Sequence, residues 1–312
     1  MAEPQRILVV IDPTATAQPA LARATSLAKS GGAQVELFIC DYDPTLRESR
    51  ALGREAVTKA RATLIESRLH RLHELAEPLQ ASGVDATVDA RWGHPLHEGI
   101  VAKADEWGAD VVVKDTHYHS ALKRSILTNT DWSLIRHCPA ALMLVKPRAP
   151  STKPCVLAAI DPLHERDPAK SLDKKILATA SSLCATTSGE LHVFHAFDIT
   201  PVIAASTEAM MMPMALPIVE ITDAMNAEHT AAVHELTDAM RLPRERVHVV
   251  QGGAREQLLA LTDRLRADVV VMGAVSRSGL ERLFIGSTAE EVLDRVPCDL
   301  LIVKADGFAS PP

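Results

Sequence analysis

Residues 269–288 read Val-Val-Val-Met-Gly-Ala-Val-Ser-Arg-Ser-Gly-Leu-Glu-Arg-Leu-Phe-Ile-Gly-Ser-Thr, and they contain the clearest structural motif of the sequence. Its apolar start, Val269–Met272, predicts a strand buried on both faces, as in a parallel sheet. Gly273 ends that strand, and Gly286-Ser287-Thr288 predicts the start of a helix. Small residues between them allow a ligand to approach the backbone closely. Because the unpaired N–H groups of a helix start attract anions, the stretch predicts a phosphate-binding loop.

This loop resembles the phosphate-binding loop of the universal stress protein family, which reads Gly, two residues, Gly, nine residues, Gly, then Ser or Thr. Gly273 and Gly286 match the outer glycines, and Ser287 matches the hydroxyl position. The middle position departs from the pattern, because it holds Ser276, whose Cβ disfavours a positive-φ backbone. The resemblance implies a fold like that of the adenine-nucleotide alpha-hydrolases. It also implies that the protein binds ATP, with or without Mg²⁺, as a regulatory ligand.

The chain contains the same pattern twice. Three apolar segments recur: Ile7–Ile11 as Val156–Ile160 (149 residues later), Ala109–Val113 as Ala267–Val271 and Leu142–Lys146 as Leu300–Lys304 (both 158 residues later). A constant spacing over several elements indicates an internal repeat. The nine extra residues place an insertion in the second copy, at Asp198–Asn226. We therefore predict two similar domains, residues 1–147 and 148–312.

Each copy alternates apolar runs with helical patterns. The first copy predicts strands at Ile7–Ile11, Gln34–Cys40, Ala86–Arg91, Asp110–Lys114 and Ala141–Lys146. It predicts helices at Gln18–Ser30, at Arg47–Ala81 (one long helix or a broken pair), at His94–Trp107 and around Asp131–Arg136. The second copy predicts strands at Val156–Ile160, Glu190–His195, Val247–Val250, Val269–Met272 and Leu300–Val303. This alternation indicates an α/β fold of two doubly wound, five-stranded parallel sheets.

The two halves are expected to pack as an intramolecular pseudo-dimer. The linker Pro147–Pro154 holds three prolines and is short and stiff. Each copy ends in an apolar strand, Ala141–Lys146 or Leu300–Lys304, and an unpaired apolar edge invites association. We expect these two strands to pair; a homodimer of whole chains is compatible with the same sequence.

Composition excludes several classes of partner. The net charge of −7 argues against nucleic acids and anionic membrane surfaces. No apolar run approaches the ~20 residues that span a bilayer, and no signal peptide precedes the first strand. The five scattered cysteines form no Cys-x-x-Cys pair, which indicates reduced thiols. We expect a cytoplasmic protein that binds a nucleotide or another small molecule.

The predicted ligand site lies at the carboxyl edge of the second sheet, where open α/β sheets bind ligands. The family resemblance implies that Asp161 contacts the base or ribose of a nucleotide. Asp-Pro is also a common turn sequence, and Asp12-Pro13 recurs in the first copy, so a purely structural role stays open. The predicted binding residues are Asp161, Pro162, Met272, Gly273, Ser276, Gly286, Ser287 and Thr288.

The first copy has lost the phosphate loop. Counting back 158 residues from the four loop positions gives Asp115, Tyr118, Thr128 and Asn129. Asp115 adds negative charge where phosphate would approach, and Tyr118 adds bulk. We expect the first copy to serve as a scaffold or to bind something else.

No catalytic motif occurs, so a binding protein is expected rather than an enzyme, although slow ATP hydrolysis fits the same site. Paired histidines such as His192 and His195 are interpreted as surface or loop residues, because two ligands do not close a zinc site. Residues Ala204–Val219 hold four methionines in five positions. The segment is interpreted as an insertion that covers the seam between the domains with apolar side chains, but methionine-rich surfaces also adapt to apolar partners. The alternative function is therefore binding of an apolar ligand or a protein, through this insertion or the sheet crevice.

Overall fold

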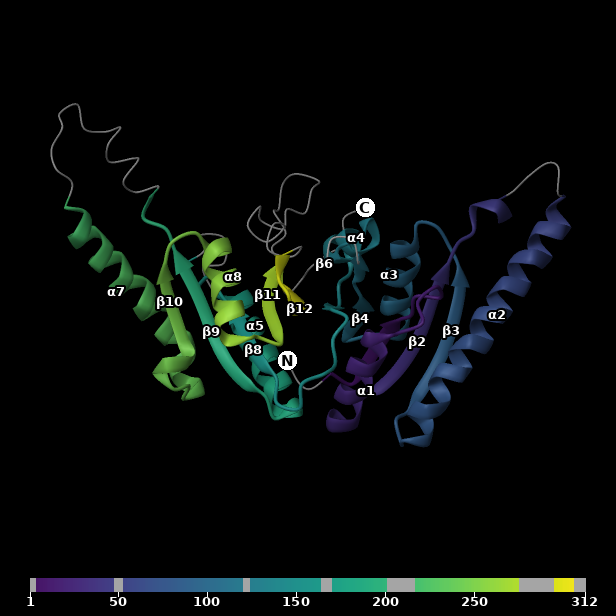
Figure 1. Cartoon of the computed structure of the whole chain (residues 1–312), viewed down its shortest axis with the longest axis horizontal. Helices are drawn as coiled ribbons and strands as arrows, with labels where there is room; N and C mark the ends of the chain where they lie inside the picture. The colour runs from purple at the N-terminus through teal and green to yellow at the C-terminus, as the bar shows by residue number, and fades with distance from the viewer. Residues whose placement is uncertain are drawn as a thin grey trace, which may run out of the picture.

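The computed structural model describes residues 4–47, 53–119, 124–163, 170–200, 217–274 and 295–305; of residues 117–119 and 124–126 it describes the backbone. Its main feature is one sheet of ten strands in the order β10-β9-β8-β11-β12-β7-β4-β1-β2-β3 (Figure 1). The strands of the first half are β1 (Arg6–Val10), β2 (Gln34–Asp41), β3 (Ala86–Trp92), β4 (Val111–Asp115) and β7 (Ala141–Val145). Those of the second half are β8 (Cys155–Ala159), β9 (Glu190–Phe197), β10 (Val247–Gln251), β11 (Val269–Ala274) and β12 (Asp299–Lys304).

The two halves repeat one topology. Within each half all neighbouring strands run parallel, and the first strand lies in the middle of the five. In the first half, β2 and β3 lie on one side of β1, and the chain then crosses to form β4 and β7 on the other side. In the second half, β9 and β10 lie on one side of β8, and β11 and β12 lie on the other. The predicted doubly wound, five-stranded parallel sheets are therefore confirmed. Each half has one topological switch point, between β1 and β4 or between β8 and β11.

The last strands of the two halves join the sheets. β7 and β12 pair antiparallel, with Leu142 opposite Ile302 and Leu144 opposite Leu300. Both strands are buried along their whole length, so each removes the apolar edge of the other. The predicted pseudo-dimer is confirmed as one continuous sheet.

Helices cover both faces of the sheet. One face is covered by α1 (Pro19–Gly31), α2 (Arg54–Ala81), α5 (Ser171–Thr187) and α7 (Ile218–Thr237). The other is covered by α3 (Leu96–Trp107), α4 (Asn129–His137) and α8 (Ala254–Leu265). Figure 1 shows α2 and α7 at the two outer ends of the molecule, beyond the edge strands β3 and β10. Because both faces are covered, the strands read as continuous apolar runs.

Polar contacts also cross the seam between the halves. Arg23 of α1 lies 2.6 Å from Oδ2 of Asp299, the first residue of β12, whose side chain is fully buried. Oδ1 of Asp299 accepts a hydrogen bond from the Lys146 backbone at 2.9 Å. Lys304 donates to the carbonyl oxygen of Ile135 in α4. These contacts bind the first half to β12, the terminal strand of the second half.

One local prediction needs correction, and one element was not predicted. The helix expected from Arg47 begins at Arg54, and a separate short 3-10 turn, η1 (Pro44–Leu46), precedes it with Asp43 as its cap. The segment of the first half that corresponds to the phosphate loop contains an antiparallel hairpin, β5 (His117–His119) with β6 (Arg124–Ile126). The second half has two further short turns, η2 (Asp238–Met240) and η3 (Arg244–Arg246). No helix in the described ranges is long and apolar enough to cross a membrane.

Candidate functional site

The crevice of the first half opens at the switch point between β1 and β4. It forms a cavity of about 210 Å³ at the carboxyl ends of these strands. Its apolar wall includes Leu96 and Ile100 of α3, and its polar lining is Asp12, Thr14, Lys114, Asp115, Thr128 and Thr130. A space of this size takes a small molecule rather than a single water.

Asp12 shapes the floor of this cavity by turning the chain. Its Oδ1 accepts hydrogen bonds from the backbone N–H and the hydroxyl of Thr14, at 2.8 and 2.6 Å. This is the pattern in which an Asp side chain bonds the backbone two residues on. In the first half, the structural interpretation of the Asp-Pro pair therefore has direct support.

Asp115 occupies the place of the first glycine of the loop. Its Oδ1 accepts the N–H of Ala20, in the first turn of α1, at 2.6 Å. The start of α1 has no cap from its own Gln18, so Asp115 supplies one from the neighbouring strand. Burial raises the pKa of Asp115 to about 6, and the Ala20 N–H and Lys114 oppose that shift.

Lys114 and Thr128 of this crevice are paired with protein groups. Lys114 lies 2.8 Å from Oδ1 of Asp131 and donates to the carbonyl oxygen of Asp115 at 3.0 Å. Thr128 and Asp131 form a capping box at the start of α4, with bonds of 2.7 and 3.2 Å. The start of α4 is thus capped by Thr128 together with Asp131.

The second half brings four of the predicted site residues to one edge of its sheet. Asp161 and Pro162 follow β8, and Met272 and Gly273 lie near the end of β11, the strand paired with β8. Asp161 is exposed and its backbone N–H donates to Oδ1 of Asp173 in α5 at 3.0 Å, while Pro162 is buried. Ser276, Gly286, Ser287 and Thr288 lie outside the described residues, as does most of the methionine-rich segment Ala204–Val219.

Gly273 has a packing role that the motif does not reveal. A Cβ added at this position would lie 2.6 Å from Cδ2 and 2.9 Å from Cγ of Leu172, and 3.1 Å from Cδ1 of Ile176. Both residues are buried core residues of α5. The glycine therefore allows α5 to pack closely on β11, whether or not a ligand is bound.

A histidine pair beside Asp161 was not predicted. His195 of β9 has an exposed fraction of 2%, so its interpretation as a surface or loop residue is wrong. Its Nδ1 lies 3.0 Å from the carbonyl oxygen of Ile160, and its Nε2 lies 2.7 Å from Nδ1 of His229 in α7. Burial lowers the pKa of both imidazoles, and Asp161 opposes that shift.

The roles within this pair follow from the carbonyl, which can only accept. Nδ1–H of His195 must donate to Ile160, so in the neutral ring Nε2 is the acceptor. His229 then donates from its own Nδ1. In the first half Ile39 holds the position of His195, since Ile7 pairs with Val35 as Val156 pairs with Leu191. The contact joins residues 34 apart in sequence, and spacing within one strand could not reveal it.

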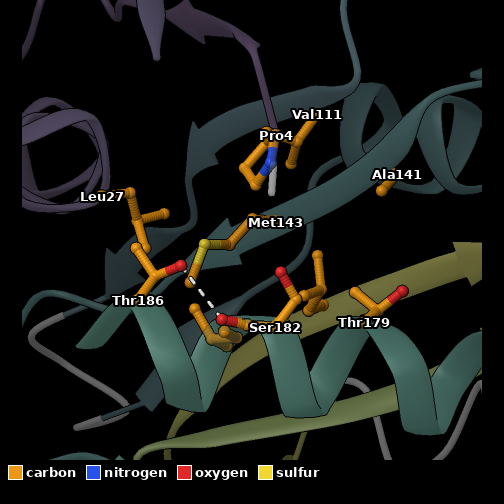
Figure 2. Close-up of a pocket in the computed structure, with 10 residues that line it drawn as sticks. Pro4, Leu27, Val111, Ala141, Met143, Thr179, Ser182 and Thr186 are labelled. Carbon is orange, nitrogen blue, oxygen red and sulfur yellow. Dashed lines mark hydrogen bonds between the residues drawn. The ribbon is translucent and has the colours of Figure 1, made fainter. Parts of the chain in front are cut away.

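A second, smaller cavity lies at the seam between α1 and α5 (Figure 2). Leu27, Met143 and Leu301 form its apolar walls. On the α5 side, the hydroxyl of Thr186 donates to the carbonyl oxygen of Ser182 at 3.0 Å. The volume of about 40 Å³ accommodates water-sized molecules, so this gap does not provide a site for an apolar ligand.

Comparison with known proteins agrees with the fold and the repeat. The universal stress protein family model matches residues 3–146 and again residues 156–304. Universal stress protein E of Escherichia coli K12 is 31% identical over 312 residues, covering 100% of this chain and 97% of the relative. Universal stress protein E of Photorhabdus laumondii is 28% identical over 313 residues, covering 100% of this chain and 98% of the relative.

Solved structures give the same result at full length. A functionally unknown protein from Pseudomonas aeruginosa PAO1 superposes with a TM-score of 0.76 at 26% identity, covering 97% of this chain and 93% of that one. A universal stress protein from Archaeoglobus fulgidus superposes with a TM-score of 0.64 at 17% identity, covering 96% and 98%, which shows the shared fold. Two family domains in tandem and a full-length relative above 30% identity establish that this chain belongs to the universal stress protein family.

Proposed function

We propose that the second half binds ATP or a related nucleotide as a regulatory ligand, and that the protein acts in a cytoplasmic stress response by binding rather than by catalysis. One observation supports this most directly. Asp161 and Gly273 lie at the ends of adjacent strands, at the switch point of the second sheet. Open α/β sheets bind their ligands at that place, and the sequence that follows Gly273 carries the near-complete phosphate loop.

Each proposed contact has a chemical reason. Backbone N–H groups at Gly286, Ser287 and Thr288 would hold the phosphates, since a helix start carries unpaired donors and partial positive charge. Ser287 and Thr288 would add hydroxyl donors, and Ser276 would donate from the middle of the loop. Mg²⁺ would enter with the triphosphate. Asp161, Pro162 and Met272 would contact the base and ribose side.

One nucleotide is expected per chain. The first half presents Asp115 in place of Gly273, and its Lys114 is already paired with Asp131. A polyphosphate entering that crevice would meet the carboxylates of Asp12 and Asp115 and no uncommitted lysine in its described lining. Like charges at close range are repulsive in such a low-dielectric site.

Calorimetric titration of the full chain with ATP tests the proposal. We expect Ser276→Gly to strengthen binding, because glycine restores the family pattern and adopts a positive φ without the steric penalty of a Cβ. Gly286→Val should abolish binding by blocking backbone approach. Ser287→Ala should weaken it at least about tenfold, the effect of losing one hydrogen bond to a charged group. Asn129→Ala, the matching position of the first half, is the control and should leave affinity unchanged.

The titration also has a clear negative outcome. If neither the natural chain nor Ser276→Gly binds ATP at millimolar concentration, nucleotide binding is excluded. If Asn129→Ala weakens binding as much as Ser287→Ala does, the nucleotide lies in the first half and the proposed site is wrong.

A further inference from the structure

The outer helix α7 packs into the core only along its second half. Its buried residues are Ala232, Val233 and Thr237. In its first half, residues 218–228, no residue is buried, and Ile218 and Val219 have exposed fractions of 47% and 69%. None of these residues packs against either core cluster of the described chain. Among the described residues, the first hydrogen bond or ring contact between α7 and the sheet is therefore made by His229.

His229 joins α7 to β9 through stacked rings and one hydrogen bond. The centroid of its ring lies 4.9 Å from that of His195 and 4.7 Å from that of Phe197, with interplanar angles of 23° and 15°. Its Nδ1 lies 2.7 Å from Nε2 of His195. His195 and Phe197 are both buried side chains of β9. The attachment of the exposed part of α7 therefore depends on a pair of titratable rings, His195 and His229.

The hydrogen bond of this histidine pair requires a lone pair on one of the two facing nitrogens. The Nδ1–H of His195 is used by the carbonyl oxygen of Ile160, so only Nε2 of His195 faces His229. One added proton leaves the bond intact, because the ring that stays neutral still offers an acceptor. Two added protons remove both acceptors, since an imidazolium carries N–H groups on both nitrogens. Two donors and two positive charges then face each other, and the contact breaks.

The charged groups around the pair place this second protonation in the acid range. Burial lowers the pKa of both rings, and charge on His229 lowers the pKa of His195 further. The carboxylate of Asp161, after β8, opposes both shifts, and Glu228 of α7 also opposes that of His229. Both rings are therefore neutral near pH 7, and the pair fills with protons below the ordinary histidine pKa of 6.5.

The other elements packed near the pair offer no competing partner. Asp173 of α5 accepts the backbone N–H of Asp161 at 3.0 Å. On β10, Nε2 of His248 lies 3.0 Å from Nδ1 of His192. Neither side chain forms a hydrogen bond with His195 or His229 in the described part of the chain. The state of the pair thus follows from its own two rings and the carboxylates beside them.

The corresponding outer helix of the first half, α2, is attached by groups that do not titrate in this range. Nε of Arg68 donates to Oδ2 of Asp41 at 2.7 Å, and Nε of Arg61 donates to the carbonyl oxygen of Leu46 at 2.9 Å. A guanidinium keeps its charge throughout the acid range. Ile39 also stands where β9 has its buried histidine. The sensitivity to protons is therefore specific to the second half.

We propose that residues 218–228 of α7 form a flap that opens in acid, released from β9 when the pair of His195 and His229 holds two protons. The helix stays attached through Ala232 and Val233, which belong to the buried part of α7. Opening uncovers Phe197, whose exposed fraction is 4% in the closed state, and so gives the protein an apolar surface that it lacks at neutral pH. The flap is independent of the nucleotide proposal, because it operates in the chain without any ligand.

Amide hydrogen exchange of the full chain without nucleotide tests the proposal, once the rates are corrected for the pH dependence of intrinsic exchange. As the pH falls from about 7.5 to about 4.5, protection of residues 222–229 should drop at least about tenfold, because the hydrogen bond and the ring contacts are lost together. Residues 54–71 of α2 are the internal comparison and should keep their protection. Raising the pH again should restore the protection of the flap.

Three variants separate the histidine pair from other effects of acid. His195→Ile combined with His229→Leu replaces both rings by apolar side chains and should keep the flap protected at both pH values. His229→Phe alone keeps a ring against Phe197 but cannot take up a proton. Its exchange should lose most of the pH dependence, which covers the case in which the double variant fails to fold. His234→Gln removes another histidine of α7, so it is the matched control and should open in acid as the natural chain does.

Three results would overturn the proposal. The first is unchanged protection of the flap over this pH range in the natural chain. The second is acid opening of His229→Phe to the same extent as the natural chain, because the pair would then not control the flap. The third is an equal loss of protection in α2, which would show that acid unfolds the whole chain rather than this helix end. Failure of ATP to bind would leave all these measurements unaffected, so the two proposals fail separately.

Discussion

At the residue scale, the two halves use the same backbone positions for different chemistry. Position 115 holds an aspartate that reaches the start of α1, whereas its counterpart Gly273 leaves room for Leu172 of α5. Similarly, Ile39 is an apolar core residue, whereas its counterpart His195 is a buried imidazole that bonds two other groups. The fold therefore tolerates polar replacements in its core where a helix end, a carbonyl or a second imidazole supplies the missing partner.

The buried histidine predicts a pH-dependent stability. Because burial lowers the pKa of His195 below its usual 6.5, the folded state holds the neutral ring and protonation favours unfolding. Stability from this group is complete above about pH 6.5 and should decline as the pH falls below that value. His195→Ile, which restores the residue of the first half, should make this decline shallower. Melting temperatures measured across that range test it, with the exposed His73→Gln as control.

The groups around the pair set the expected size of this effect. Asp161 opposes the pKa shift of both rings, and Glu228 also opposes that of His229. The total loss of stability should therefore be smaller than burial alone would produce. Equal slopes for the natural chain and His195→Ile would show that the pair does not control acid stability.

Gly273 gives a second prediction at this scale. Gly273→Ala places a Cβ 2.6 Å from Leu172, and overpacking of a core typically costs about 1–3 kcal/mol. Combining it with Leu172→Ala should recover part of that loss, because the smaller side chain removes the clash. Urea unfolding of both single variants and the double variant measures the coupling. Strictly additive losses would mean that Gly273 is not required by this contact.

At the element scale, the strands were predictable and some loops and contacts were not. Runs such as Val111–Val113 and Val269–Val271 are apolar on both faces, so they predict buried parallel strands. The apolar last strand of each half predicts how the halves pair. The hairpin β5–β6 is too short to produce a recognisable alternation, so it was missed. The His195–His229 contact was missed because it depends on how α7 packs over β9.

The candidate site of the second half was also predictable in part. Asp161 and Gly273 could be placed together, because the ends of parallel strands meet at one edge of a sheet and the switch point follows from the strand order. For the first half, the sequence predicted only the loss of the phosphate-binding loop, from Asp115 in place of glycine. That it keeps an open cavity depends on how α3, α4 and the strand ends pack around it.

At the scale of the whole molecule, a buried ion pair links the halves, and breaking it should lower the free energy of unfolding. Arg23 belongs to the first half and Asp299 to the second, and both side chains are almost wholly buried. Arg23→Met should cost about 3–5 kcal/mol, because Asp299 would remain buried without its counter-charge. Burial already raises the pKa of Asp299, so this loss should shrink as the pH falls and the carboxyl is protonated.

A second substitution separates loss of charge pairing from loss of packing. Asp299→Asn keeps an acceptor for the Lys146 N–H, so adding it to Arg23→Met should restore much of the stability. Arg255→Met breaks an exposed contact with Glu256 and should cost no more than about 1 kcal/mol. Urea unfolding followed by circular dichroism measures all four proteins. If Arg23→Met and Arg255→Met lose equal stability, the ion pair does not stabilise the contact between the halves. The pairing of β7 with β12 must then stabilise that contact without it.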